Sequence, residues 1–172
     1  AFTKPRPVDE QILQDQSLGY RVYDGISDPF QSTTASYFHR SVGGYHAAKL
    51  QRYQDMIVNH LSKGNQKAFD MLNTKYFISM GPNEQPIVQV NPGALGTAWY
   101  VKSVKMVDTN NQEIDALNEI NPANTAVVHK DFASLVSSAL DTTVQGSVKM
   151  TAFSPNKIEY ESTSDKDGMV VF

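Results

Sequence analysis

The sequence predicts an α+β fold, in which a helical N-terminal half packs on an antiparallel, sandwich-like β-sheet in the C-terminal half. Between Tyr45 and Leu61, apolar residues recur at spacings of three and four, the period of an amphipathic helix. After residue 75, short β-branched and aromatic runs alternate with turn sequences. The 172 residues show no repeat or linker, so we expect a single domain over 1–172, mainly helical over 1–75 and mainly β over 76–172.

The strongest helical signal covers 45–61 and predicts a helix of about four or five turns. Its apolar face consists of Leu50, Tyr53, Ile57 and Leu61. Gly64 can take the left-handed conformation that ends a helix, and Asn65 can then cap a short second helix over 66–73. The preceding diglycine, Gly43-Gly44, permits a tight entry into the long helix or the close approach of a partner.

The second half of the chain has the pattern of short strands. The expected strands cover 76–78, 86–90, 98–107 and 125–129, with one helical turn at 113–118. Three more strands are expected around 148–152, 158–160 and 169–172, separated by turns at 154–156 and 165–168. Because only short turns separate the last three strands, we expect them to pair in sequence order as a meander.

Composition excludes several classes of protein. The chain has no cysteine, which excludes disulfides, thiol catalysis and iron–sulfur ligation. Its longest apolar runs have four residues, against about 18 for a membrane span, so we expect neither a membrane span nor a secretory signal within these residues. A net charge of −3 gives no general affinity for nucleic acid. The chain begins without methionine and stops inside an apolar strand, so we expect a segment of a longer protein.

The histidines do not have the spacing of a metal site. Two of them, His46 and His60, lie on the predicted helix but are fourteen residues apart, whereas a helical metal site needs two ligands four residues apart. No serine lies in a strained Gly-x-Ser-x-Gly turn, so a hydrolase has no support. We therefore expect no metal, no cofactor and no catalytic residue in this chain.

One segment, 34–53, combines tyrosines, histidines, cations and a diglycine. On the predicted helix His46, Lys49 and Tyr53 would share a face, with Arg52 beside Lys49. Such a surface can hold an anion or a sugar through charge-assisted hydrogen bonds and stacking. The alternative is that the tyrosines anchor the helix and the cations are solvated. The candidate ligand-binding residues are Tyr37, His39, Arg40, Gly43, Gly44, Tyr45, His46, Lys49, Arg52 and Tyr53.

The same segment carries a family resemblance. The stretch Tyr37–Gln54, read YFHRSVGGYHAAKLQRYQ, and the stretch Met71–Ile78, read MLNTKYFI, closely resemble the extracytoplasmic region of YfhO-type bacterial membrane proteins in their Bacteroidetes form. Further pieces of the same pattern are Arg21–Asp24, Asn91–Trp99 and Gly168–Phe172. The resemblance runs from about residue 20 to the end of the chain.

The resemblance implies a polytopic inner-membrane protein similar to lipid-sugar-dependent glycosyltransferases. This chain would belong to its soluble region on the periplasmic side, with the protein's own transmembrane region as a partner. A glycan or a lipid-linked sugar would be the ligand. Catalysis in such transferases is expected from acidic residues that precede this region, so no catalytic residue is assigned here.

Two other interpretations stay open at this point. The segment 34–53 could be an internal brace between the helical and β halves of a purely structural module of the cell envelope. The chain could also be a stand-alone carbohydrate-binding module, in which aromatic residues such as Trp99 and Tyr100 stack on sugar rings.

Overall fold

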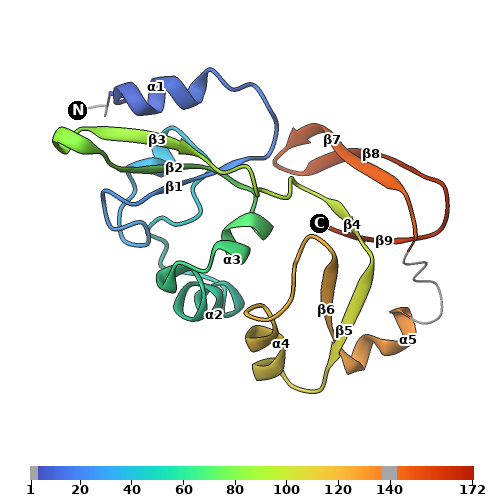
Figure 1. Ribbon diagram of the computed structural model, residues 1–172. Helices are drawn as coiled ribbons and strands as arrows, with labels where there is room; N and C mark the ends of the chain where they lie inside the picture. The colour runs from blue at the N-terminus through green and yellow to red at the C-terminus, as the bar shows by residue number, and fades with distance from the viewer. Residues whose placement is uncertain (1–3, 137–142) are drawn as a thin grey trace.

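The computed structural model describes residues 4–136 and 143–172, and it confirms the α+β class (Figure 1). The elements of the N-terminal half are α1 (Pro7–Leu13), β1 (Arg21–Asp24), the 3₁₀ helix η1 (Ala35–Tyr37), α2 (Gln51–Asn59), η2 (Leu61–Lys63), α3 (Gln66–Met71), β2 (Thr74–Met80), η3 (Pro82–Glu84) and β3 (Pro86–Val90). The helices therefore fall mostly in the first half of the chain, as expected.

The N-terminal half has three layers, with α1 on one face of a sheet and α2 and α3 on the other (Figure 1). In the sheet, β2 is central, parallel to β1 and antiparallel to β3. Side chains alternate across it, so Val22 and Ile78 face α1 whereas Tyr23 and Phe77 face the other two helices. Burial on both faces fixes the register of the strands.

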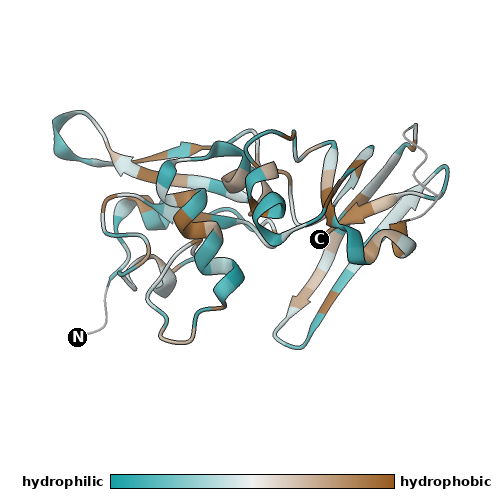
Figure 2. Cartoon of the chain, turned by 90° about the horizontal axis from the view of Figure 1, so that it is seen from below, coloured by the Kyte–Doolittle hydropathy of each residue, from teal (hydrophilic) through white to brown (hydrophobic). Residues whose placement is uncertain are grey.

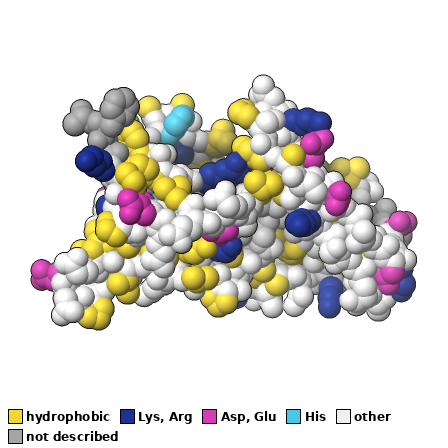
Figure 3. All heavy atoms as spheres, turned by 90° about the horizontal axis from the view of Figure 1, so that it is seen from above, with side chains coloured by type: hydrophobic (Ala, Val, Ile, Leu, Met, Phe, Trp, Pro, Cys, Tyr) yellow, Lys and Arg dark blue, Asp and Glu magenta, His cyan; other side chains and the backbone are white. Residues whose placement is uncertain are grey.

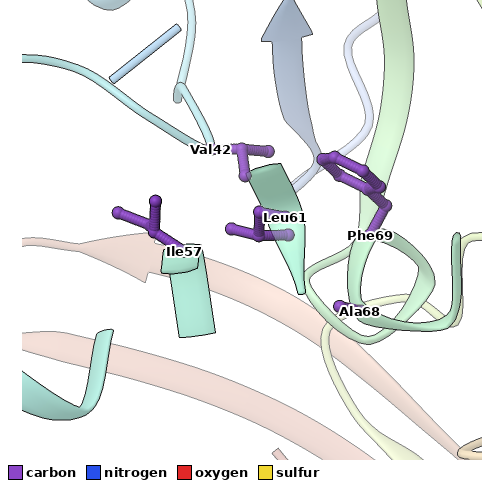
Figure 4. Packing of buried hydrophobic residues seen from close by; sticks show 5 residues of the cluster. All are labelled: Val42, Ile57, Leu61, Ala68 and Phe69. Atoms are coloured by element: carbon purple, nitrogen blue, oxygen red, sulfur yellow. The ribbon is translucent and has the colours of Figure 1, made fainter. Parts of the chain in front are cut away.

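Two apolar clusters hold these layers together. Val8 and Ile12 of α1 pack with Val22 and Ile78 of the sheet. On the opposite face the cluster in Figure 4 comes from the loop before α2, from α2 itself and from the segments that follow it. It consists of Val42, Ile57, Leu61, Ala68 and Phe69. The candidate segment 34–53 thus contributes Val42 to the core, which ties its position to that of the helices.

Over its described residues, 91–136 and 143–172, the C-terminal half forms three two-stranded sheets rather than one. Its elements are β4 (Trp99–Val101), β5 (Ser103–Val107), α4 (Asn110–Ala116), β6 (Thr125–His129), η4 (Lys130–Phe132), α5 (Ala133–Val136), β7 (Gly146–Ser154), β8 (Lys157–Ser164) and β9 (Met169–Val171). The pairs are antiparallel β4–β9, parallel β5–β6 and antiparallel β7–β8. Hydrophobic residues lie on the strands that converge beside the C-terminus (Figure 2).

The long helix expected over 45–61 is shorter in the structure. It starts only at Gln51, because Leu50 has an extended backbone and Ala48 N–H donates to His46 Nδ1 in a local turn. It ends at Asn59, where the backbone of His60 leaves the helical region. The second helix does begin after Asn65, whose side chain caps it as expected.

Two strand predictions are wrong. The strand expected over 98–107 divides at Lys102, because the N–H groups of Lys102 and Ser103 both donate to Asn124 O and break the regular ladder. The last three strands do not form a meander, since β9 pairs with β4 instead of β8. The strands 86–90 and 125–129 and the turn after Ser154 are confirmed. Within 4–136 and 143–172, no helix has the length and hydropathy to cross a membrane.

Candidate functional site

The base of the site is a buried ion-pair network at the start of α1. Arg6 caps the helix, and its backbone N–H and its Nε donate to Asp9 Oδ2 over 2.9 and 2.8 Å. Arg6 Nη2 also donates to Asp24 Oδ2 over 2.8 Å, which joins α1 to β1. Both carboxylates are fully buried. Pro7 at the first helical position and Asp9 at the third are the residue types that favour a helix start here.

His39 completes this network from the candidate segment. Its Nε2 lies 3.0 Å from Asp9 Oδ1 and its side chain is buried. Because an ionised carboxylate only accepts hydrogen bonds, Nε2 carries the proton in this contact. Burial acts to raise the pKa of Asp9, but the hydrogen bonds from Arg6 and His39 outweigh it and hold the pKa below its ordinary value. His39 Nδ1 has no hydrogen-bond partner among the described residues.

The diglycine and Tyr53 fix the backbone that follows His39. Val42 N–H donates to Val22 O over 3.0 Å, so this backbone lies beside β1. Gly44 N–H donates to Pro29 O over 2.7 Å, and a Cβ on Gly43 would lie 1.7 Å from the same oxygen. The Tyr53 hydroxyl donates to Val42 O, and burial raises the pKa of this phenol. Only glycine permits so close a crossing of the two backbone segments.

The loop 44–50 presents the remaining side chains to solvent. Tyr45 is 63% exposed and Leu50 is 77% exposed, while His46 is exposed and Lys49 half-buried. Tyr37 is 66% exposed and lies near this loop, since Oγ of the preceding residue, Ser36, is 2.9 Å from the position that a Cβ on Gly44 would take. We call this group of four exposed side chains and the half-buried Lys49 the tyrosine–lysine surface; it consists of Tyr37, Tyr45, His46, Lys49 and Leu50.

Two candidate cations are engaged elsewhere. The Arg40 guanidinium lies 3.6 Å from the ring centroid of Phe153 on β7, which links the candidate segment to the C-terminal half. Arg52 Nη2 lies 3.3 Å from Glu113 Oε2 of α4. The expectation that His46, Lys49 and Tyr53 share a helix face is wrong, because α2 begins only at Gln51. The ten candidates therefore divide into anchors, which contact other segments of the fold, and members of the tyrosine–lysine surface. The anchors are His39, Arg40, Gly43, Gly44, Arg52 and Tyr53.

The aromatic residues proposed to stack on sugars are not presented for stacking. Trp99 is half-buried and its Nε1–H donates to Pro122 O over 2.9 Å. Opposite edges of the Tyr100 ring contact the backbones of Gly146 and Gly168, where an added Cβ would lie 2.6 and 3.1 Å from ring atoms. The Tyr100 hydroxyl lies 2.8 Å from Ser162 Oγ. This arrangement favours a packing role for both rings.

The described residues contain no group of three or more acidic or histidine side chains that could hold a metal ion. Positive and negative side chains are interspersed on the face shown in Figure 3. This face therefore presents no continuous basic surface of the kind that tracks a nucleic-acid backbone.

No family model, curated protein or solved structure matches this chain.

Sequence reasoning did not identify Arg6, Asp9 or Asp24 as part of the site. Two signals were present: Pro7 followed by an acidic residue is typical of a helix start, and Asp24 closes a short strand sequence, Arg21–Asp24, whose even positions face α1. The contact between Asp9 and His39, thirty residues apart, has no signature in a single sequence.

The close crossing at Gly43 predicts a large effect of added bulk. Gly43→Ala should lower the free energy of unfolding by about 3 kcal/mol, because the methyl group would overlap Pro29 O. The matched control is Gly64→Ala, where nothing lies within 4 Å and only the left-handed backbone is penalised, by about 1 kcal/mol. Urea unfolding of both variants compares the two values, and equal losses would refute the steric role of Gly43.

The buried network predicts acid sensitivity. The pKa values of Asp9 and Asp15 are lowered in the folded chain; in each, burial opposes the shift and a cation, Arg6 or Lys75, outweighs it. A lowered folded-state pKa stabilises the fold above the unfolded value of about 4, and this stabilisation is lost as the pH falls through the folded value.

Unfolding free energies measured between pH 7 and pH 2 should therefore fall below about pH 4. Asp9→Asn should lower stability at pH 7 by about 3 kcal/mol, since Arg6 loses one of its two carboxylate partners and His39 loses the ionised acceptor of its buried hydrogen bond. The same substitution should also make the unfolding free energy depend less on pH below about pH 4. An Asp9→Asn profile parallel to that of the unmodified chain would contradict this assignment.

Proposed function

We propose that this chain is a non-catalytic extracytoplasmic domain of a polytopic membrane protein similar to the YfhO type. Its tyrosine–lysine surface would bind the phosphate-bearing headgroup of a lipid or of a lipid-linked glycan. The proposed location is the periplasmic side of the inner membrane, beside the protein's own transmembrane region. The sequence resemblance over residues 20–172 supports the location, and the exposed side chains around Gly44 support the ligand.

The main observation behind this proposal is the combination of side chains that one loop, fixed at both ends, presents to solvent. Tyr45 and Leu50 offer aromatic and aliphatic surface, and His46 and Lys49 offer donors for an anion. Tyrosine and aliphatic side chains beside a cation are typical of protein surfaces that contact the lipid–water interface. In this proposal Lys49 and the Nε2–H group of His46 bind the phosphate, while the apolar side chains contact the acyl boundary.

The electrostatic surroundings also favour an anion. His46 and Lys49 form no ion pair with a described residue, so a phosphate would not have to displace a carboxylate. The N-cap of α2, Leu50, supplies no side-chain hydrogen bond, which leaves the positive end of the helix dipole next to Lys49. These features support the binding of an anion at this surface.

A second candidate function has its own observation. His39, Gly43 and Tyr53 are engaged with other segments of the fold, which favours the interpretation of the segment as an internal brace. Bracing accounts for the anchors but not for the exposure of Leu50 or Tyr45. We therefore assign bracing to the anchors and headgroup binding to the tyrosine–lysine surface.

Vesicle binding tests this assignment. The chain should co-sediment with phosphatidylglycerol vesicles more strongly than with phosphatidylcholine vesicles. Lys49→Ala should weaken binding roughly fivefold, since one interfacial cation contributes about 1 kcal/mol. Leu50→Ser should weaken it roughly tenfold through lost apolar insertion.

The matched control is Lys63→Ala, which removes an exposed lysine of η2, beyond the C-terminal end of α2, whereas Lys49 precedes the N-terminal end of that helix. Binding of glucose 1-phosphate without vesicles would identify the phosphate-bearing sugar, rather than the lipid surface, as the ligand. Equal losses for Lys49→Ala and Lys63→Ala, or no binding to either probe, would refute headgroup binding at this surface.

A further inference from the structure

A cleft of about 680 Å³ lies between α2 and α3 on one side and α4, β6 and β9 on the other. Consecutive residues of two strands line it, Thr125–Val128 of β6 and Met169–Val171 of β9. Successive side chains of a strand point to opposite faces of its sheet. Consecutive lining residues therefore mean that the backbone edges of β6 and β9 border the cleft.

These edges are unpaired within the described part of the chain, since β6 pairs with β5 alone and β9 with β4 alone. Ser103 is opposite Thr125 in the parallel ladder, and its N–H donates to Asn124 O. Bonding therefore alternates so that Asn124 C=O and the backbone groups of Ala126 and Val128 point to β5, while Asn124 N–H donates to Asn121 O. Val127 directs its N–H and C=O to the other side, toward the cleft.

The side chains around the cleft are mostly apolar. The hydrophobic lining residues include Met56, Met71, Trp99, Ile114, Leu117 and Val171. Three lining residues are charged. Arg52 and Glu113 form an ion pair with each other, and Asp55 accepts a hydrogen bond from Gln51 Nε2. The cleft thus offers mainly apolar surface, with one carboxylate, Asp55, on the α2 side.

The charge pattern of the strand edge selects the class of ligand. A free edge presents alternating partial positive N–H and partial negative C=O groups, and another polypeptide backbone complements that alternation. An acyl chain would fill the apolar volume but would leave these groups without partners, which costs free energy when they are buried.

We propose that this cleft binds an extended peptide segment of a partner protein. The peptide pairs with the free edge of β6 around Val127 and places alternate apolar side chains against the lining of the cleft. Its central residues are uncharged. This site is separate from the tyrosine–lysine surface, and the inference does not rest on the proposed headgroup binding.

The test uses a phage-displayed library of random twelve-residue peptides, selected on the purified chain. Selected peptides should alternate apolar residues, and the leading one is synthesised for calorimetry. N-methylation of the amides on one side of this peptide should weaken binding by about tenfold or more, through lost backbone hydrogen bonds. N-methylation on the other side should have little effect.

Variants of the chain provide the matched pair. Val127→Pro removes the free N–H and should abolish binding, whereas Val127→Thr keeps the backbone donor and should bind as the unmodified chain does. If the Val127→Pro variant does not fold, the N-methylated peptides still test the proposal, because their binding is measured with the unmodified chain. Three results would overturn the proposal. The selection could yield no peptide with alternating apolar residues, N-methylation on either side could leave the affinity unchanged, or a fluorescent C16 fatty acid could displace the peptide.

Discussion

A carboxylate that is removed from water needs hydrogen-bond donors, and Asp9 obtains them from two separate segments of this chain. Arg6 donates from the start of α1, and His39 donates from the loop beyond β1. Arg6 also reaches Asp24, so one guanidinium joins the helix to the strand. Because unmatched buried charges are costly, the positions of α1, β1 and the His39 segment depend on one another.

This dependence explains how one short segment can serve two purposes. His39, Val42, Gly43 and Tyr53 contact the core or another backbone and fix the course of the chain. The loop between the fixed ends then projects its side chains outward without contributing to the core. An exposed binding loop held by a rigid base loses less conformational entropy when it orders around a ligand. The buried half of the segment thereby supports the function proposed for the exposed half.

The sequence predicts those parts of the fold that local patterns specify, and fails where distant segments decide. Strands β3 and β6 and the cap at Asn65 follow from local composition. The pairing of β9 with β4 joins segments about seventy residues apart, and no alternation of side chains encodes it. For the candidate site, residue types single out the segment 34–53, but they do not show that His39 is buried, because its partner Asp9 lies thirty residues earlier.

The coupling of His39 to the neighbouring backbone is the central claim, and amide hydrogen exchange in a His39→Leu variant tests it most directly. The account predicts that the amides of Val22 and Val42, which bond across this segment, exchange at least about ten times faster, since the variant loses a buried hydrogen bond to a charged group. Amides of β6 should keep their rates. Unchanged exchange at Val42 in a folded variant would contradict the claim.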